Sequence, residues 1–326
     1  MGKMNNKGIF FTFIAITMMA VFLLVFTPQA DISLQKNTQA IDTRISVVDN
    51  YISDLENRYF ETVLRASTYK AILSLVYYLN TTGSYISNFD ASFSEVMMTG
   101  KINGVAIDSI TGKKIMENST LTDWSNKIIE TAKDTLNVNT TIDIINVSAF
   151  QTNPWDIGSS MSVKFTVTSN VAEWKKSAVI TTTISIEGLI DPSYLVNTSG
   201  AYANQIKRSS VDFDKWDITK VREHLRNGTY LHWQDSDAPS FLMRFTNTTS
   251  SSSCCGIESL VNPNKTTTSD QIESYVDFLF WNHTYNTRCS DLYNITGLWD
   301  EFRYFKLDFV HVAIYNITAQ DSVRTC

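Results

Sequence analysis

The chain opens with an uncharged stretch that constrains where the rest of the polypeptide can lie. Residues 8–26 carry no charged side chain, Lys3 and Lys7 precede them, and Asp31 is the first acid after them. These nineteen residues at about 1.5 Å rise form roughly 28 Å of helix, close to the roughly 30 Å hydrocarbon thickness of a bilayer. Lysines on the N-terminal flank favour a cytoplasmic N-terminus. The stretch predicts a tail and transmembrane anchor over residues 1–30, a lipid bilayer as partner, and a single-pass cell-membrane protein whose C-terminal domain is extracellular.

Whether and where the chain is cleaved determines whether this uncharged stretch stays on the mature protein. A secretory signal needs small residues at positions −1 and −3 of the cut, and Pro28-Gln29-Ala30 would place proline at −3. An uncleaved signal-anchor has no such requirement. Both fates stay open at this point, together with a third that depends on the residues before the apolar run.

The residues at the start of the apolar run carry a family resemblance. Asn6-Lys7-Gly8 followed directly by Ile9 resembles the class III signal of type IV pilins, and in particular that of archaeal pilin-like surface proteins. The resemblance implies cleavage after Gly8, so that Lys7, Gly8 and Ile9 form a processing site and the apolar helix stays on the mature protein. It also implies lateral association of subunits. Phe13 stands where bacterial pilins usually carry a glutamate, an acid that archaeal pilin-like proteins often lack.

Asparagine glycosylation signals are more frequent than chance predicts. With 25 asparagines and 71 serines and threonines in 326 residues, random order would give about five Asn-x-Ser/Thr triplets. The sequence has 11, none with proline in the middle: Asn80, Asn118, Asn139, Asn146, Asn197, Asn227, Asn247, Asn264, Asn282, Asn294 and Asn316. A chain rich in these residue types accumulates triplets by composition alone, whereas the excess favours an outer surface that carries N-linked glycans.

Charge and cysteine usage exclude two classes of function. The net charge of −6 argues against a nucleic-acid partner, which would need a basic face. The four cysteines lie in the last quarter of the chain without the spacing of a zinc site. In an exported region they predict disulfides. Because neighbouring side chains rarely converge, we expect Cys254 and Cys255 each to bond a distant partner, Cys289 or Cys326.

Residues 31–80 predict a long amphipathic helix that continues beyond a kink at Pro28. Its apolar seam recurs every three or four positions, with one interval of seven: Leu34, Ile41, Ile45, Val48, Ile52, Leu55 and Tyr59. Such a seam packs along another helix, which favours self-association through residues 8–60, or against the chain's own sheet. From Val63 to Leu79 apolar side chains occupy nearly every face, which predicts burial. Asn80-Thr-Thr-Gly83 predicts the end of the helix.

Residues 81–190 predict an α+β extracellular domain. The run from Val105 to Met116 is typical of a hairpin, with its turn at Thr111-Gly112. Residues 121–136 place Trp124, Ile128, Ile129, Ala132 and Leu136 on one helical face after a Ser119 or Thr120 cap. Three strand-like runs follow at 140–150, 161–168 and 177–187, with a hairpin loop at 170–174 between the last two.

The overall prediction is an α+β fold in which the long helix packs on an antiparallel sheet. The middle strand supports this, because Val163, Phe165 and Val167 alternate with polar residues and so predict one buried and one wet face. A boundary is expected at 188–192. Residues 191–326 then predict a disulfide-containing, loop-rich β region with strands at 241–245 and 305–314.

Catalytic motifs are absent from the sequence. It contains no GxSxG, HExxH, Walker or GxGxxG pattern, and no close-spaced pair among His224, His232, His283 and His311. The prediction is a protein that is not an enzyme and needs no cofactor or metal, although a serine or cysteine nucleophile and a histidine base can still meet in space.

Two acidic clusters and the predicted topology suggest alternative functions. Asp212, Asp214 and Asp217 are typical of a solvated loop, since no EF-hand glycine or closing glutamate accompanies them. Asp235-Ser236-Asp237 resembles the DxD of metal-dependent glycosyltransferases, which would imply a type II membrane enzyme with a pocket around these acids. The anchor, helix and mixed ectodomain also resemble a Cache-type ligand-binding sensor, but no second membrane helix follows. The favoured hypothesis is a surface glycoprotein with a structural, pilin-like or adhesive role.

Overall fold

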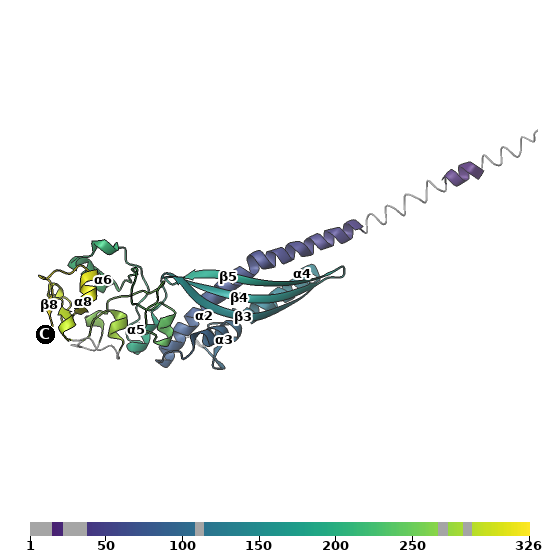
Figure 1. The fold of residues 1–326 in the computed structure, drawn as a ribbon. Helices are drawn as coiled ribbons and strands as arrows, with labels where there is room; N and C mark the ends of the chain where they lie inside the picture. The colour runs from purple at the N-terminus through teal and green to yellow at the C-terminus, as the bar shows by residue number, and fades with distance from the viewer. Residues whose placement is uncertain (1–14, 22–37, 108–113, 267–272, 283–288) are drawn as a thin grey trace, which may run out of the picture.

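The chain is an α+β protein arranged along one axis (Figure 1). The computed structural model describes residues 15–21, 38–107, 114–266, 273–282 and 289–326. A long helix emerges from one end and lies along a three-stranded antiparallel sheet in the body. Short helices and a smaller sheet follow at the opposite end of that sheet, where the C-terminus lies. The predicted combination of helices with antiparallel sheets is confirmed.

The long helix runs without a break from residue 38 to Thr82. Residues 38–54 are α-helical, η1 (Leu55–Tyr59) is a single π-helical turn, and α2 (Phe60–Thr82) continues to a C-cap at Gly83 with a φ of 62°. The left-handed backbone there suits glycine because it has no Cβ. The predicted helix end is therefore confirmed.

The π-helical turn changes which residues face the body. Val48, Ile52 and Leu55 of the predicted seam are buried, so the seam packs against the chain's own domain. A π turn holds one residue more than an α turn, and this shifts the apolar face by one position. Tyr59 is consequently 53% exposed while Phe60 is buried. The seam prediction is wrong at Tyr59 for this reason.

The predicted transmembrane helix is not supported. In the described part of the chain, no helix combines the length and the apolar character that crossing a membrane requires. Only residues 15–21 of the uncharged stretch are described, as a short helix, and the long helix after it carries charged residues along its exposed side. This finding overturns the transmembrane, signal-anchor and single-pass membrane predictions.

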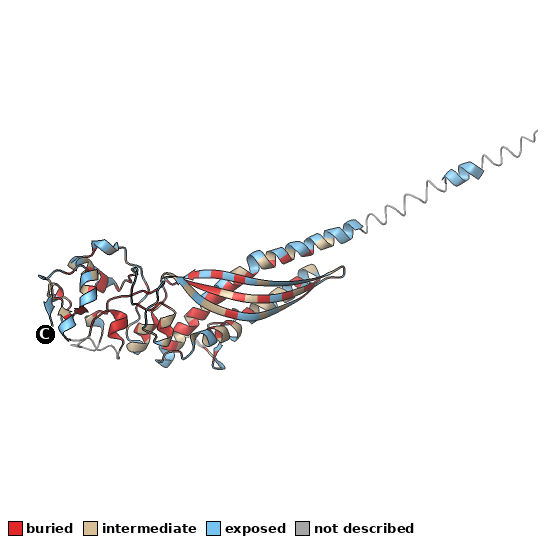
Figure 2. Cartoon of the chain, in the orientation of Figure 1, coloured by how far each residue is buried: buried red, intermediate tan, exposed pale blue. Residues whose placement is uncertain are grey.

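The central sheet has the order β3-β4-β5, with every pair antiparallel. Its strands are β3 (Asn139–Asn153), β4 (Asp156–Thr168) and β5 (Glu173–Ser185), each longer than predicted. Val163, Phe165 and Val167 are buried as expected. Their face of the sheet packs against α2 and α4, and burial alternates along the strands (Figure 2). The ring of Phe60 meets Phe165 edge-on at 5.4 Å between centroids.

Two helices and a tight hairpin complete the first layer. Helix α3 (Phe89–Thr99) leads into β1 (Lys101–Ile102) and β2 (Val105–Ala106), which pair around Asn103-Gly104. The Asn-Gly turn was missed in the sequence, and the predicted turn at Thr111-Gly112 lies outside the described residues. Helix α4 (Leu121–Leu136) is confirmed in full, with a capping box between Thr120 and Asp123.

The opposite end of the molecule, which we call the distal lobe, consists of short elements after residue 190 (Figure 1). Its helices are α5 (Pro192–Asn197), η2 (Phe213–Lys215), α6 (Ile218–Asn227), η3 (Met243–Thr246), η4 (Pro263–Lys265), α7 (Asp277–Phe280), η5 (Cys289–Asp291), η6 (Thr296–Leu298) and α8 (Phe309–Ile314). Its sheet has the order β7-β6-β8, formed by β7 (Lys306–Asp308), β6 (Leu292–Asn294) and β8 (Val323–Arg324).

Two predicted strands of this lobe are wrong. The run 241–245 forms a turn and the start of η3, and 305–314 supplies a three-residue strand followed by α8. In the first run Arg244 is buried and pairs with carboxylates inside the lobe. The positions of these partners, rather than the strand-like sequence pattern, determine the backbone conformation there. In the second, Asp308 caps α8 by accepting from the amides of Val310 and His311.

Candidate functional site

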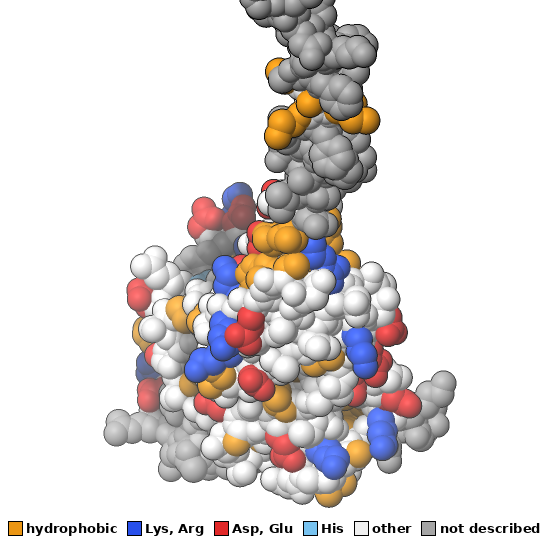
Figure 3. All heavy atoms as spheres, turned by 90° about the vertical axis from the view of Figure 1, so that its right-hand side faces the viewer, with side chains coloured by type: hydrophobic (Ala, Val, Ile, Leu, Met, Phe, Trp, Pro, Cys, Tyr) orange, Lys and Arg blue, Asp and Glu red, His pale blue; other side chains and the backbone are white. Residues whose placement is uncertain are grey.

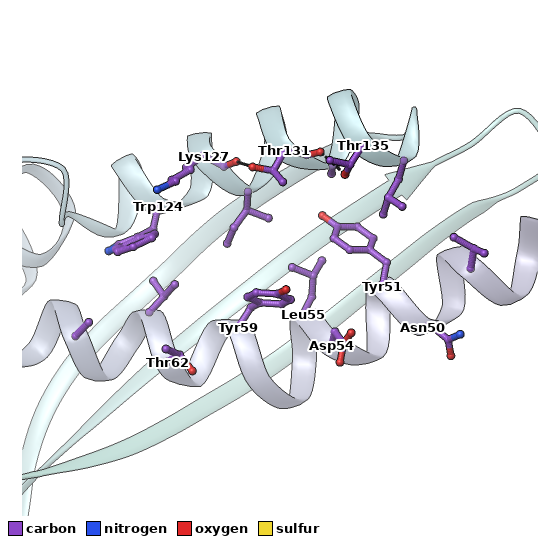
Figure 4. A pocket seen from close by; sticks show the side chains of 16 residues that line it. Asn50, Tyr51, Asp54, Leu55, Tyr59, Thr62, Trp124, Lys127, Thr131 and Thr135 are labelled. Atoms are coloured by element: carbon purple, nitrogen blue, oxygen red, sulfur yellow. Dashed lines mark hydrogen bonds between the residues drawn. The ribbon is translucent and has the colours of Figure 1, made fainter.

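A groove separates the long helix from α4 (Figure 4). Its volume is about 660 Å³, and its walls come from residues between 47 and 66 on the long helix and between 124 and 136 on α4. We call it the helical groove. On α4 its lining runs from Trp124 to Leu136, a length of about 18 Å, so the groove is about as long as three turns of a further helix.

The lining of the helical groove is mainly apolar. Tyr51, Leu55 and Tyr59 point from the long helix into the space between the two helices (Figure 4). The phenolic oxygen of Tyr51 lies 3.4 Å from Thr140 Oγ1, and burial raises the pKa of Tyr51. Asp54 and Lys127 are the charged residues that line the groove. Such a surface favours an apolar ligand over a polar substrate.

Two threonines of α4 add little polarity to the groove, because their hydroxyl groups bond within the helix. The hydroxyls of Thr131 and Thr135 donate to carbonyls one turn earlier on α4, at 2.8 and 2.6 Å, which occupies their donors within the helix. Trp124 stands at the other end of the groove with the Lys127 ammonium 5.3 Å from its ring centroid. Trp124 Nε1 is buried and has no hydrogen-bond acceptor among the described residues.

Exposed apolar side chains continue from the groove along the long helix. Figure 3 views the end from which this helix emerges and shows hydrophobic side chains gathered where it enters the body. The exposed large apolar residues of this end are Ile16, Met18, Met19, Val21, Ile41, Val47 and Tyr59. Exposed apolar side chains gathered at one end of a protein in this way indicate a candidate interaction site.

The predicted processing and glycosylation residues have different outcomes. Lys7, Gly8 and Ile9 lie outside the described residues. None of the 11 predicted glycan acceptors is buried: Asn80, Asn118, Asn139, Asn146, Asn227, Asn247, Asn264 and Asn316 are exposed, while Asn197, Asn282 and Asn294 are half-buried. The Asn197 side-chain amide donates to the Tyr85 hydroxyl at 2.7 Å, so this acceptor is already engaged. Glycosylation itself stays a prediction.

The acidic clusters form local capping and surface contacts. Asp212 bonds the Lys215 ammonium at 2.6 Å, and Asp217 caps α6 by accepting from the Lys220 amide. Asp235 and Asp237 are exposed on a turn, and neither lines the helical groove. Across the described segments, no group of three or more His, Cys, Asp and Glu side chains is placed to hold a metal ion.

One histidine sits in an arrangement that superficially suggests catalysis. His311 Nδ1 lies 2.7 Å from Asp308 Oδ2, and the Ser274 hydroxyl donates to that same oxygen at 2.7 Å. The serine therefore bonds the aspartate and not the histidine, which is the wrong order for a nucleophile and its base. His311 Nε2 faces Glu258 at 3.5 Å, and all four residues are buried. This cluster is a buried ion network.

The two other histidines within the described residues have partners of their own, away from this network. Buried His224 lies 2.5 Å from the Thr229 hydroxyl, and burial lowers its pKa to about 4. His232 meets the carbonyl of Gly256 at 2.7 Å. His283 lies outside the described residues.

The cysteines pair differently from the prediction. Cys254 and Cys255 form a disulfide with each other, with 3.7 Å between their Cα atoms. A turn in which the Cys255 amide donates to the Ser252 carbonyl brings the two side chains together, and this local geometry lies outside the usual Cα spacing on which the prediction relied. Cys326 is also disulfide-bonded. The side chain of Cys289 lies outside what the structure describes.

The helical groove was missed by sequence reasoning. The pattern placed Trp124 and Ile128 on one helical face of α4, and both are half-buried where they line the groove. A signal was present: Val47 and Tyr51 lie beside the seam of the long helix, which makes its apolar face wider than one packing interface needs. No protein-family model, curated protein or solved structure matches the chain.

Proposed function

We propose that the chain is a non-enzymatic, glycosylated structural subunit of pilin-like architecture that assembles with copies of itself. The observation that supports this proposal is the helical groove, an apolar trough beside a helix whose emerging half exposes apolar side chains. The occupant we assign to the groove is the N-terminal helical segment of a second copy. Ile16, Met18, Met19 and Val21 of that segment are 58 to 75% exposed in a single copy.

Burial of these surfaces supplies the driving force for assembly. Removing apolar area from water stabilises a complex by about 25 cal/mol for each Å² buried. A groove about three turns long fits a helix better than a compact ligand. Because the protruding helix and the groove are different surfaces, the contact is head-to-tail and extends into a chain of subunits.

The first prediction tests this contact in the full chain. Val47→Glu/Tyr59→Glu places two carboxylates at the rim of the groove, where the native side chains are 38 and 53% exposed. We expect sedimentation velocity at increasing protein concentration to show large assemblies for the unmodified chain and monomers for the variant. The thermal unfolding midpoint should stay nearly unchanged, because neither side chain belongs to the core.

A matched control uses the open face of the sheet. Val179 on β5 is 69% exposed and does not line the groove, so Val179→Glu adds the same charge to a different apolar site. We expect this control to assemble like the unmodified chain. Assembly that survives the groove variant, or that is lost equally in the control, would contradict the proposal.

A further inference from the structure

The distal lobe contains a second cavity, of about 650 Å³, whose lining is cationic. Lys207 and Arg208 come from the segment after α5, Arg226 from the last turn of α6, and Lys265 from η4. The polar side chains between them are amides and a hydroxyl, from Asn204, Gln205, Asn227 and Thr229. We call this hollow the basic cavity.

Among the described residues, three of the four positive charges have no carboxylate partner. Arg226 is paired with Glu301, its Nε donating to Oε1 at 2.8 Å. For Lys207, Arg208 and Lys265, no ion pair with any described residue is present. This concentration of unpaired cations stands out in a chain whose net charge is −6. Like charges gathered without counter-ions repel one another and favour an anionic ligand.

Aromatic rings hold two of these cations in place. The Lys265 ammonium lies 4.7 Å from the ring centroid of Tyr202, and the Arg208 guanidinium lies 5.3 Å from that of Trp155. Cation–π contacts of this kind restrict long side chains that would otherwise sample many rotamers. The charges are therefore positioned before a ligand arrives, which lowers the entropic cost of binding.

The floor of the basic cavity is fixed by buried hydrogen bonds. The Asn204 amide donates to the Gly228 carbonyl at 3.2 Å and to the Tyr230 hydroxyl at 3.0 Å, while the Tyr202 hydroxyl donates to Asn204 Oδ1 at 3.3 Å. Gly228 has a φ of 60°, and a Cβ there would collide with Asn204 Oδ1. Glycine at this position allows the close approach that builds the floor.

We propose that the basic cavity binds an acidic carbohydrate chain, through the carboxylates or sulfates of its sugars. The three unpaired cations match anionic groups, and the side-chain amides of Gln205 and Asn227, which also line the cavity, match sugar hydroxyls. A nucleic acid is disfavoured, because binding a phosphate backbone needs an extended basic face and this chain is acidic overall. Asn227, a predicted glycan acceptor, lies at the same cavity, so a glycan attached there would compete for it.

The test uses the full chain produced without glycosylation, with calorimetric titration of three polymers. Polygalacturonate carries carboxylates, dextran sulfate carries sulfates, and unmodified dextran is the neutral reference. We expect binding to at least one acidic polymer that weakens as salt is added, since salt screens exposed charges, and none to dextran. Which acidic polymer binds identifies whether the carboxylated or the sulfated sugar is the ligand.

Variants matched in charge locate the binding. Lys207→Gln/Arg208→Gln/Lys265→Gln should weaken binding at least about tenfold, a readily measured difference. Lys133→Gln/Lys164→Gln/Lys175→Gln removes the same charge from exposed sites on α4 and the central sheet and should bind like the unmodified chain. Equal losses in both triple variants, no acidic polymer bound, or equally tight binding of double-stranded DNA would overturn the proposal.

This inference does not depend on self-assembly. The groove variant Val47→Glu/Tyr59→Glu should bind the acidic polymer with unchanged affinity even as a monomer, because the basic cavity belongs to the distal lobe alone. Failure of one proposal therefore leaves the other standing.

Discussion

Replacing Arg244 with methionine should lower the free energy of unfolding by about 3 to 5 kcal/mol, the range for removing one partner of a buried ion pair. Arg244 is 1% exposed and stands between two carboxylates with no exposure of their own. Its Nη1 donates to Asp191 at 2.7 Å and to Asp277 at 2.9 Å, and its Nη2 bonds the Ile257 carbonyl. The variant leaves both carboxylates in the lobe without their cation.

The surrounding hydrogen bonds make this site sensitive to the loss. The Tyr230 hydroxyl donates to Asp191 at 2.7 Å, and the Ser259 hydroxyl donates to Asp277 at 2.8 Å. Burial alone would lower the pKa of the Arg244 guanidinium, but the two carboxylates raise it above its ordinary value. These neutral donors cannot replace a full charge in a buried site.

Urea denaturation of the full chain measures the effect. Arg226→Met, which breaks an exposed pair with Glu301, is the matched control and should unfold close to the unmodified chain. Adding Asp191→Asn and Asp277→Asn to Arg244→Met should recover part of the loss, because the unpaired charges are then gone. An Arg244→Met variant as stable as the control would show that the network contributes nothing net.

The elements that depend on local signals were predictable from the sequence. Helix α4 begins after Thr120 and ends at Leu136 as expected, because its cap and apolar face lie within one short window. The three strands of the central sheet were found for the same reason, since alternation reports burial directly. The Asn103-Gly104 turn carried an equally local signal and was overlooked.

Features that depend on distant partners could not be predicted. Arg244 lies in a run with strand-like composition, and only the three-dimensional positions of Asp191 and Asp277 explain its turn. The sequence does not show that the walls of either cavity meet, because the first joins residues 47–66 to residues 124–136 and the second collects four separate segments between residues 190 and 265. The sequence contains no clear signal for the π-helical turn at η1, so the exposure of Tyr59 could not be predicted.

We expect the stability of the chain to fall as the pH rises from about 7 to about 10, through the deprotonation of His311. Burial alone would lower the pKa of this imidazole, but Glu258 and Asp308 raise it from 6.5 to about 10. A folded-state pKa above the unfolded value adds stability that is fully present below pH 6.5 and is lost as the pH passes through about 10. The loss should reach a few kcal/mol.

Acid should also destabilise the fold, so the stability of the chain should be greatest near neutral pH. Burial alone would raise the pKa values of Glu258 and Asp308, but the His311 imidazole lowers both below their ordinary values. The stability that these two carboxylates add is lost as the pH falls through their folded-state pKa values. His224 acts in the same direction between pH 6.5 and about 4, since burial keeps its imidazole neutral. Burial raises the pKa of Tyr315 well above 10, so this residue lowers the stability only from about pH 10 upward, where the tyrosine of the unfolded chain ionises, and the change below that pH belongs to His311.

The variant His311→Gln isolates the alkaline effect in urea titrations repeated across pH. It should be less stable at pH 7, where Glu258 and Asp308 lose their cation, and its stability should change little between pH 7 and 10. His232→Gln removes an imidazole that contacts the Gly256 carbonyl rather than a carboxylate and should keep the alkaline slope. If the slope persists in His311→Gln, another group must titrate there and the buried triad of His311, Glu258 and Asp308 is not its origin. If the slope disappears, the charged imidazole of His311 stabilises the buried Glu258 and Asp308 carboxylates inside the distal lobe. A neutral hydrogen-bond donor in place of His311 would not titrate between pH 7 and 10 and so could not produce this loss of stability.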